Sequence, residues 1–297
     1  MSTILIAGGT GLIGSRLAVL LREKGHNVRI LTRSPQNEEQ FTWDPAAGTI
    51  DEAALRGADA VVNLAGAGIA DKRWTPGRKR LIIDSRVQSA RTLRNAFLQT
   101  GIRPEVYVSA SAIGYYGDSG ERLMSETDAP VGTGFMVSCC RQWESAADEV
   151  ATLGIRTAVF RIGVVLAKES GALAEFIKPL RFGIGGYFAD GKAWYSWIHR
   201  DDVCRMLIWA IENQQIKGTF NAVAPHPVRN KDLVKSIAKA MRQPAVFAPG
   251  PALVMRLALG EMAAVILNSN RISAEKALKA GFEFEYPTVE GALEAIF

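Results

Sequence analysis

The first residues with an arrangement that can do chemistry are three glycines near the amino terminus. Gly8, Gly11 and Gly14 come directly after the apolar run Ile4–Ala7 and open a helical pattern, which gives the spacing GxxGxxG. Glycines in such a turn let the backbone approach a pyrophosphate, and the free N–H groups at the start of the next helix bind its oxygens. The spacing predicts a dinucleotide site, rather than a purely structural turn, that comprises Gly8, Thr10, Gly11, Leu12, Ile13 and Gly14.

The residues after the second predicted strand indicate which dinucleotide binds. Sites for NAD place an acidic residue about 20 residues beyond the glycines, where it holds the ribose hydroxyls. No acid stands between Glu23 and Glu38, and Thr32, Arg33 and Ser34 occupy the expected position. A guanidinium and two hydroxyls suit a 2′-phosphate, because charge-assisted hydrogen bonds are the stronger ones. The sequence therefore favours NADP(H), and the alternative is that Arg33 is an ordinary solvated residue.

Alternating strand and helix patterns surround this site. Apolar runs bounded by turn residues predict strands at 4–7, 28–31, 60–64, 106–109, 157–162 and 219–223, and helical periodicity predicts helices at 12–24, 75–98, 135–152 and 203–212. This alternation indicates an α/β fold with a Rossmann-like, doubly wound parallel sheet. We expect that fold in residues 1–165, with 194–225 returning to it. A smaller, mainly helical substrate or lid region is expected in 166–193 and 226–297.

Composition excludes several other classes of protein. The chain has 297 residues, 48% of them hydrophobic and 22% charged, with a net charge of +5, so it is not intrinsically disordered. Its most apolar stretch, Ala252–Leu267, contains Arg256 and Glu261 and is too short to span a membrane. Because neither a secretion signal nor a disulfide pattern is present, a cytoplasmic protein is expected. We expect no contact with nucleic acid or membranes and no bound metal.

Longer motifs resemble the extended short-chain dehydrogenase/reductases. They are the glycine turn, NLAG at 63–66, SAS at 109–111 and WIHRDDV at 197–203. In addition, SASAIGYYG at 109–117, RQWESAA at 141–147 and RIGVVLA at 161–167 are similar to the atypical epimerase branch of that family, which carries an extra C-terminal domain. The resemblance covers essentially the whole chain. It implies an NADP(H)-binding oxidoreductase or epimerase-like protein whose substrate is small and polar, either anionic or a nucleotide sugar.

The same resemblance implies roles for individual residues. Leu64 and Ala65 would line the adenine and ribose side of the cofactor, with Gly66 beside them. Arg86 would lie near the cofactor phosphates and Val165 near the nicotinamide. Simple packing at the sheet edge is the alternative role for the apolar members of this set.

One departure from the family pattern bears on catalysis. The family uses a serine with a Tyr-x-x-x-Lys pair, in which the lysine lowers the tyrosine pKa for proton exchange with the substrate. No tyrosine of this chain has a lysine four positions later, and the resemblance puts Met136 and Cys140 at those two places. Ser111 stands where the family's serine falls. Tyr115 and Tyr116 are the first candidates to replace the acid, and stacking against cofactor or substrate is the alternative for both.

Two functions of different class remain open. The first is an NADP(H)-dependent enzyme with its substrate between Ser111, Tyr115 and the aromatic segment Tyr187–Trp197; candidate anion contacts are Arg161, Arg181 and Lys192. The second is a catalytically degenerate regulatory or scaffold protein that kept the dinucleotide pocket. The retained serine and the aromatic segment favour the enzyme, whereas the missing Tyr-x-x-x-Lys pair favours the second function.

Overall fold

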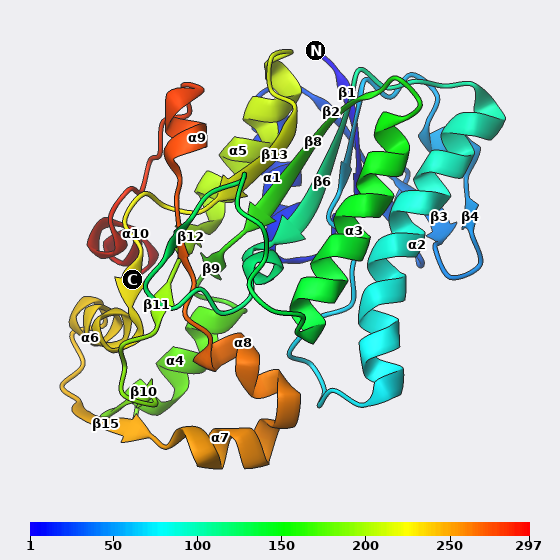
Figure 1. Ribbon diagram of the computed structural model, residues 1–297. Coiled ribbons are helices and arrows are strands. Elements are labelled where there is room, and N and C mark those ends of the chain that lie inside the picture. Colours follow the sequence, from blue (N-terminus) through cyan, green and yellow to red (C-terminus); the bar gives the residue numbers. More distant parts are fainter.

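A mostly parallel sheet of eight strands forms the centre of the computed structural model, which describes residues 1–297 (Figure 1). Its strands are β1 (Thr3–Ala7), β2 (Asn27–Thr32), β3 (Gln40–Asp44), β4 (Thr49–Ile50), β5 (Ala60–Asn63), β6 (Val106–Ala112), β8 (Arg156–Ile162) and β13 (Gly218–Ala222). They lie in the order β13-β8-β6-β5-β1-β2-β3-β4, and only β4 runs antiparallel to its neighbour. The chain builds outward from β1 in both directions, and doubly wound sheets open a binding crevice at such a point.

Helices cover both faces of this sheet. One face carries α1 (Leu12–Glu23) and α5 (Arg200–Glu212), and the other carries α2 (Pro76–Thr100) and α3 (Phe135–Ala151) (Figure 1). The side chains of β1 alternate between the two faces of the sheet. Ile4 and Ile6 pack with α1 and α5, whereas Leu5 and Ala7 pack with α2 and α3. The predicted Rossmann-like fold is confirmed.

The remaining elements form a smaller region with its own apolar cluster. They are β7 (Leu123–Met124), β9 (Val164–Leu166), α4 (Ala172–Leu180), β10 (Ile184–Phe188), β11 (Trp194–Tyr195), β12 (Trp197–His199), β14 (Val228–Arg229), α6 (Asn230–Ala240), β15 (Val246–Gly250), α7 (Ala252–Leu259), α8 (Ala264–Leu267), β16 (Arg271–Ile272), α9 (Glu275–Lys279) and α10 (Val289–Ile296). Leu173, Leu233 and Leu293 bring α4, α6 and α10 together. Tyr195 and Trp197 belong to this cluster too, whereas Ile198 and Ala277 pack into the cluster of the main sheet.

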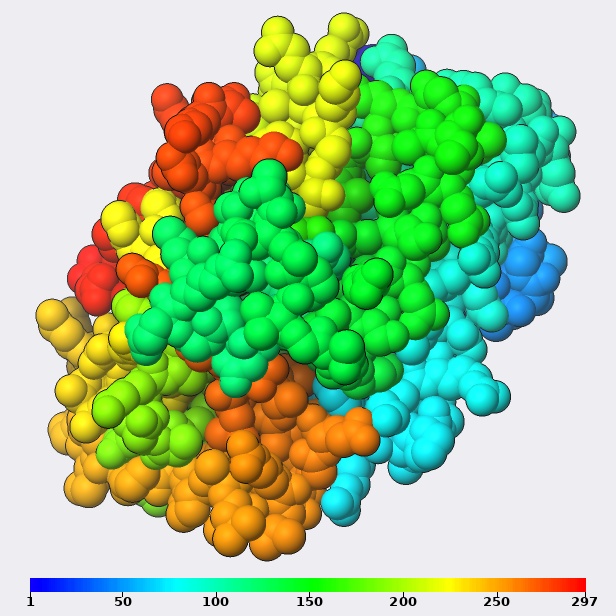
Figure 2. Space-filling view, viewed as in Figure 1, coloured from blue at the N-terminus to red at the C-terminus, as the bar shows by residue number.

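The segment α7–α8 of the smaller region contacts the start of α2 and the chain that leads into it. In the space-filling view it lies, in orange, beside the cyan segment that leads into α2 (Figure 2). Lys79 of α2 forms an ion pair with Glu261 at 2.8 Å, and Arg73 donates a hydrogen bond to the carbonyl of Leu257. None of the helices combines the length and the apolar character that crossing a membrane requires.

Candidate functional site

The turn between β1 and α1 can only be built with glycines. Gly8 has a φ of +80°, and a Cβ there would lie 2.8 Å from the carbonyl carbon of Leu64. A Cβ on Gly14 would overlap the carbonyl oxygen of Gly8. Both glycines therefore allow the backbone of β1, α1 and the chain after β5 to come into direct contact.

The start of α1 is open to an anion. Its N-cap residue is Gly11, no side chain caps the helix, and its first turn contains no acid. The first N–H groups of a helix have no partner within the helix. Here they belong to Leu12, Ile13 and Gly14, which are three of the predicted cofactor residues.

Thr32, Arg33 and Ser34 lie at the end of β2, next to the glycine turn. The Thr32 hydroxyl accepts a hydrogen bond from the Ser34 N–H at 3.3 Å, which fixes the bend of the chain. Arg33 is exposed and forms no ion pair. Its guanidinium is therefore free to bind a phosphate at this edge of the sheet.

A second arginine without a carboxylate partner lies where the chain leaves β5. Arg86 is only 6% exposed, and its Nη1 donates hydrogen bonds to the carbonyls of Ala67 and Ile82 at 3.0 and 2.9 Å. Its Cζ lies 4.9 Å from the ring centroid of Trp143, and burial lowers the pKa of its guanidinium. A Cβ on Gly66 would lie 3.0 Å from that Cζ. A buried cation held only by carbonyls and an aromatic face is well suited to an anionic ligand.

Val165 lies in a segment that also approaches the glycine turn. It lies in β9, opposite Ile198 of β12. The loop after β9 reaches the glycine turn, since a Cβ on Gly171 would lie 3.4 Å from Cδ2 of Leu12 and 3.9 Å from the Val165 carbonyl oxygen. The structure thus gathers the predicted cofactor residues around one edge of the sheet.

Ser111 is held by an ion pair that the sequence did not predict. Its hydroxyl donates to Oε1 of Glu144 at 2.7 Å, and Arg161 donates to both oxygens of that carboxylate, from Nε at 2.9 Å and Nη2 at 2.8 Å. Ser111 is 2% exposed and Arg161 is 4% exposed. The arginine expected to contact an anionic substrate is therefore neutralised inside the protein.

Tyr116 is enclosed, which corrects its assignment as a candidate acid. It is fully buried; its hydroxyl donates to Oδ1 of Asn221 at 2.6 Å and accepts from Nη1 of Arg161 at 2.9 Å. Burial, partly opposed by the guanidinium of Arg161, raises the pKa of Tyr116 to about 12. A hydroxyl with both partners inside the protein cannot reach a ligand.

Tyr115 is the accessible member of the pair. It is half-buried, and its hydroxyl makes no hydrogen bond within the chain. The Cζ of Arg161 lies 3.4 Å from its ring centroid, and the ring of Tyr116 meets it edge-on at 5.4 Å. The ring is held in place while the hydroxyl stays free.

Met136 and Cys140 face the loop that carries these tyrosines. A Cβ on Gly114 would lie 3.2 Å from Cβ of Met136 and 3.7 Å from Sγ of Cys140. Burial raises the pKa of Cys140 to about 12, so the thiol is neutral and not a nucleophile. Neither residue can supply the proton-transfer chemistry of a tyrosine and lysine.

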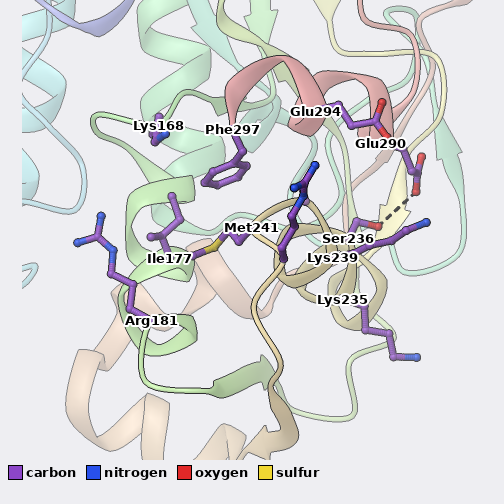
Figure 3. A pocket seen from close by; sticks show the side chains of 12 residues that line it. Lys168, Ile177, Arg181, Lys235, Ser236, Lys239, Met241, Glu290, Glu294 and Phe297 are labelled. Carbon is purple, nitrogen blue, oxygen red and sulfur yellow. Dashed lines mark hydrogen bonds between the residues drawn. The ribbon is translucent and has the colours of Figure 1, made fainter.

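Two of the candidate anion contacts, Lys192 and Arg181, and the titratable His199 lie outside this arrangement. His199 caps α5, because its Nδ1 accepts from the Asp201 N–H at 3.2 Å. Lys192 is exposed and lies 3.9 Å from Asp190. Arg181 lines a hollow of about 1000 Å³ between α4, α6 and α10, which the predicted catalytic and cofactor residues do not line (Figure 3).

The fold and the glycine turn together define a Rossmann-like protein of the NAD(P)-binding class. Residues 4–222 match the NAD dependent epimerase/dehydratase family, and residues 251–296 match a domain of unknown function, DUF1731. The chain belongs to the NAD dependent epimerase/dehydratase family, in the branch that carries this C-terminal domain, as the sequence motifs predict.

Relatives of known sequence or structure extend over nearly the whole chain. An epimerase family protein of Mycobacterium leprae is 36% identical over 98% of this chain and 94% of its own length, and a chloroplastic one of Arabidopsis thaliana is 37% identical over 99% and 86%. The solved human epimerase family protein with NADPH has a TM-score of 0.89 at 29% identity, covering 99% of this chain and 98% of its own. A nucleoside-diphosphate sugar epimerase of Corynebacterium glutamicum has a TM-score of 0.80 at 31% identity, covering 98% and 57%.

Proposed function

We propose that the chain binds NADP(H) and is an oxidoreductase or epimerase-like enzyme acting on a small polar substrate. One observation carries the proposal. Two separate arginines without carboxylate partners, Arg33 and Arg86, lie at the end of the sheet that holds the glycine turn. The human relative solved with NADPH supports it.

Each part of the dinucleotide has residues that suit it. The N–H groups at the start of α1 would hold the pyrophosphate, and Thr32, Arg33 and Ser34 would hold the 2′-phosphate. Leu64, Ala65 and Gly66 would line the adenine and ribose, and Arg86 lies beside them. Val165 would lie near the nicotinamide, which, when bound, exchanges a hydride with the substrate.

Tyr115 is the residue proposed to exchange a proton with the substrate oxygen, because its hydroxyl is the one left without an internal partner. Ser111 acts beside it. An ionised Glu144 only accepts hydrogen bonds, so Ser111 is the donor between them and its oxygen can only accept from a substrate hydroxyl. Tyr116 positions Tyr115 and Arg161 and does not itself touch the substrate. A nucleotide sugar is a candidate substrate, supported by the bacterial sugar epimerase above.

Calorimetry with NADPH and NADH tests the cofactor assignment. We expect NADPH to bind more tightly. Two charge-assisted contacts from the Arg33 guanidinium are worth about 1.5–3 kcal/mol each, so Arg33→Ala should weaken NADPH binding by at least about a hundredfold and leave NADH binding unchanged. Equal losses for both nucleotides, or no heat with either, would contradict the proposal. A panel of carbonyl compounds, alcohols and nucleotide sugars with the cofactor then tests for turnover.

A regulatory or scaffold protein that binds NADP(H) without turnover is the second candidate. Two points support it: the resemblance puts Met136 and Cys140 at the places of the usual tyrosine and lysine, and Ser111 is almost fully buried. Tight cofactor binding without turnover of any compound in the panel would favour this function over the enzyme.

A further inference from the structure

The helix α7 exposes most of its apolar side chains. Its sequence is ALVMRLAL, with Arg256 as the one polar residue; none of its residues is buried, and Ala252, Met255 and Leu259 are half-buried. Leu253, Val254 and Leu257 are 68%, 58% and 70% exposed. A helix so rich in apolar residues normally buries them against protein or lipid. This helix begins the most apolar stretch of the sequence, and the dinucleotide site does not use it.

Further exposed apolar residues lie on the strand that leads into α7 and on its neighbour. Val246 of β15 lies opposite Ile184 of β10, and they are 77% and 53% exposed; Phe182, just before β10, is 83% exposed. β15 leads directly into α7, and the two lie along one end of the smaller region (Figure 1). We call the six residues the apolar patch: Phe182, Ile184, Val246, Leu253, Val254 and Leu257. Exposed apolar residues gathered at one end of a protein mark an interaction surface.

The hollow beside the apolar patch is lined mainly by cations. Residues 176–189 and 233–260 contain six Lys or Arg, but Glu175, Asp190, Asp232 and Glu261 directly flank them, and Lys178 forms an ion pair with Glu175 at 2.6 Å. Two of these, Arg181 and Arg242, also line the hollow between α4, α6 and α10 (Figure 3). Arg181 directly precedes Phe182, and the Val246 N–H donates to the carbonyl of Gly183, so the hollow and the patch adjoin. The hollow is lined by five cations in all, the other three being Lys168, Lys235 and Lys239, and by two carboxylates, Glu290 and Glu294.

Arg242 occupies an unfavourable backbone position. It follows the end of α6 with a φ of +52°, in the left-handed region where glycine is usual. Glycine there would relieve the backbone. The Arg242 side chain lines the hollow beside Lys239.

We propose that the apolar patch and the basic hollow together dock on an anionic lipid bilayer. The apolar side chains enter the boundary between headgroups and acyl chains, and the cations bind lipid phosphates. A bilayer fits better than a second copy of the chain, because pairing two such surfaces would bring their cations together. The contact is peripheral, and it departs from the expectation of no membrane contact, which considered only the length of the apolar stretch.

Co-sedimentation of the full chain with vesicles tests this. We expect binding to phosphatidylglycerol–phosphatidylcholine vesicles, little binding to pure phosphatidylcholine, and release at high salt because surface charges are screened. The double variant Leu253→Asp/Leu257→Asp should reduce binding at least about tenfold. Leu278→Asp, on exposed α9 at 46% exposure, is the matched control and should bind like the wild type.

Arg242→Gly tests vesicle binding in a variant whose fold should not be destabilised. It should weaken binding about fivefold, since one cation near an anionic surface contributes about 1 kcal/mol, while the melting temperature stays the same or rises. Circular dichroism checks that the Leu253→Asp/Leu257→Asp protein is folded, and if it is not, Arg242→Gly decides alone. No binding to anionic vesicles at low salt would overturn the proposal. So would a wild-type dimer, seen by analytical ultracentrifugation, that Leu253→Asp/Leu257→Asp converts to monomer.

Discussion

The guanidinium of Arg161 lies over the ring of Tyr115, with its Cζ 3.4 Å from the ring centroid. The same guanidinium makes two hydrogen bonds to Glu144. Tyr115 is thus positioned by an ion pair that joins β8 to α3, and Ser111 is bound to the same carboxylate. The two proposed catalytic residues therefore share one support, and a change in the ion pair should affect both.

Replacing the two adjacent tyrosines one at a time separates proton exchange from positioning. Tyr115→Phe removes a hydroxyl with no partner inside the chain, so we expect an unchanged melting temperature and a turnover number lower by about 10²-fold or more. Tyr116→Phe removes the hydroxyl that donates to Oδ1 of Asn221 and accepts from Nη1 of Arg161, which should cost about 1–3 kcal/mol of unfolding free energy. The opposite pattern, with the larger loss of turnover and no loss of stability in Tyr116→Phe, would contradict the assignment.

Replacing one partner of the Arg161–Glu144 ion pair should destabilise the protein far more than replacing both partners. The Arg161 and Glu144 side chains are 5% and 12% exposed. Glu144→Leu alone leaves a buried guanidinium unpaired and should cost about 3–5 kcal/mol in urea unfolding. Glu144→Leu/Arg161→Met removes both charges and should recover most of that loss. Arg91→Met, which breaks an exposed pair with Glu149, is the control and should cost less than about 1 kcal/mol. A double variant no more stable than Glu144→Leu would refute the argument.

The glycine turn gives a test that does not depend on finding a substrate. Gly14→Ala places a methyl group against the Gly8 carbonyl and must displace the turn, so we expect at least a tenfold loss of NADPH affinity. Gly77→Ala is the matched control, because a Cβ there meets nothing and alanine favours the helix by up to about 1 kcal/mol. Unchanged NADPH binding in Gly14→Ala would mean that the nucleotide does not use this turn.

The cofactor half of the site could be predicted because its sequence signals are local. The glycine turn and the residues after β2 all fall within the first 34 positions, and each conveys its chemistry without knowledge of the fold. The contacts of Ser111 could not be found in this way, since they join β6, α3 and β8. One signal existed: Arg161 stands in the apolar strand RTAVFRI, and a buried arginine needs a buried acid.

The strand β3 lies outside the predicted strands, although a local signal for it exists. It reads QFTWD, in which polar and apolar residues alternate over five positions. The run is short and only Trp43 among its residues is buried, and pairing with the end of β2 completes the strand. The aromatic segment at 187–197 likewise gains its order from tertiary contacts, such as Tyr195 against Phe176.

The stability of the fold should depend on pH through His199. Burial lowers the pKa of this imidazole, and its Nδ1 accepts a hydrogen bond from the Asp201 N–H, which a protonated ring could not do. Because the folded pKa lies below the unfolded one, near 6.5, the neutral ring contributes its full stability above about pH 6.5. That contribution is lost as the pH falls toward the folded pKa, by up to about 1.4 kcal/mol per pH unit.

His199→Asn keeps an acceptor for the Asp201 N–H but does not titrate. Its unfolding free energy, measured by urea unfolding, should therefore fall less between pH 7 and pH 5 than that of the wild type. His226→Asn, at an exposed position, is the control and should keep the wild-type slope. Identical slopes for His199→Asn and the wild type would show that another group sets the pH dependence.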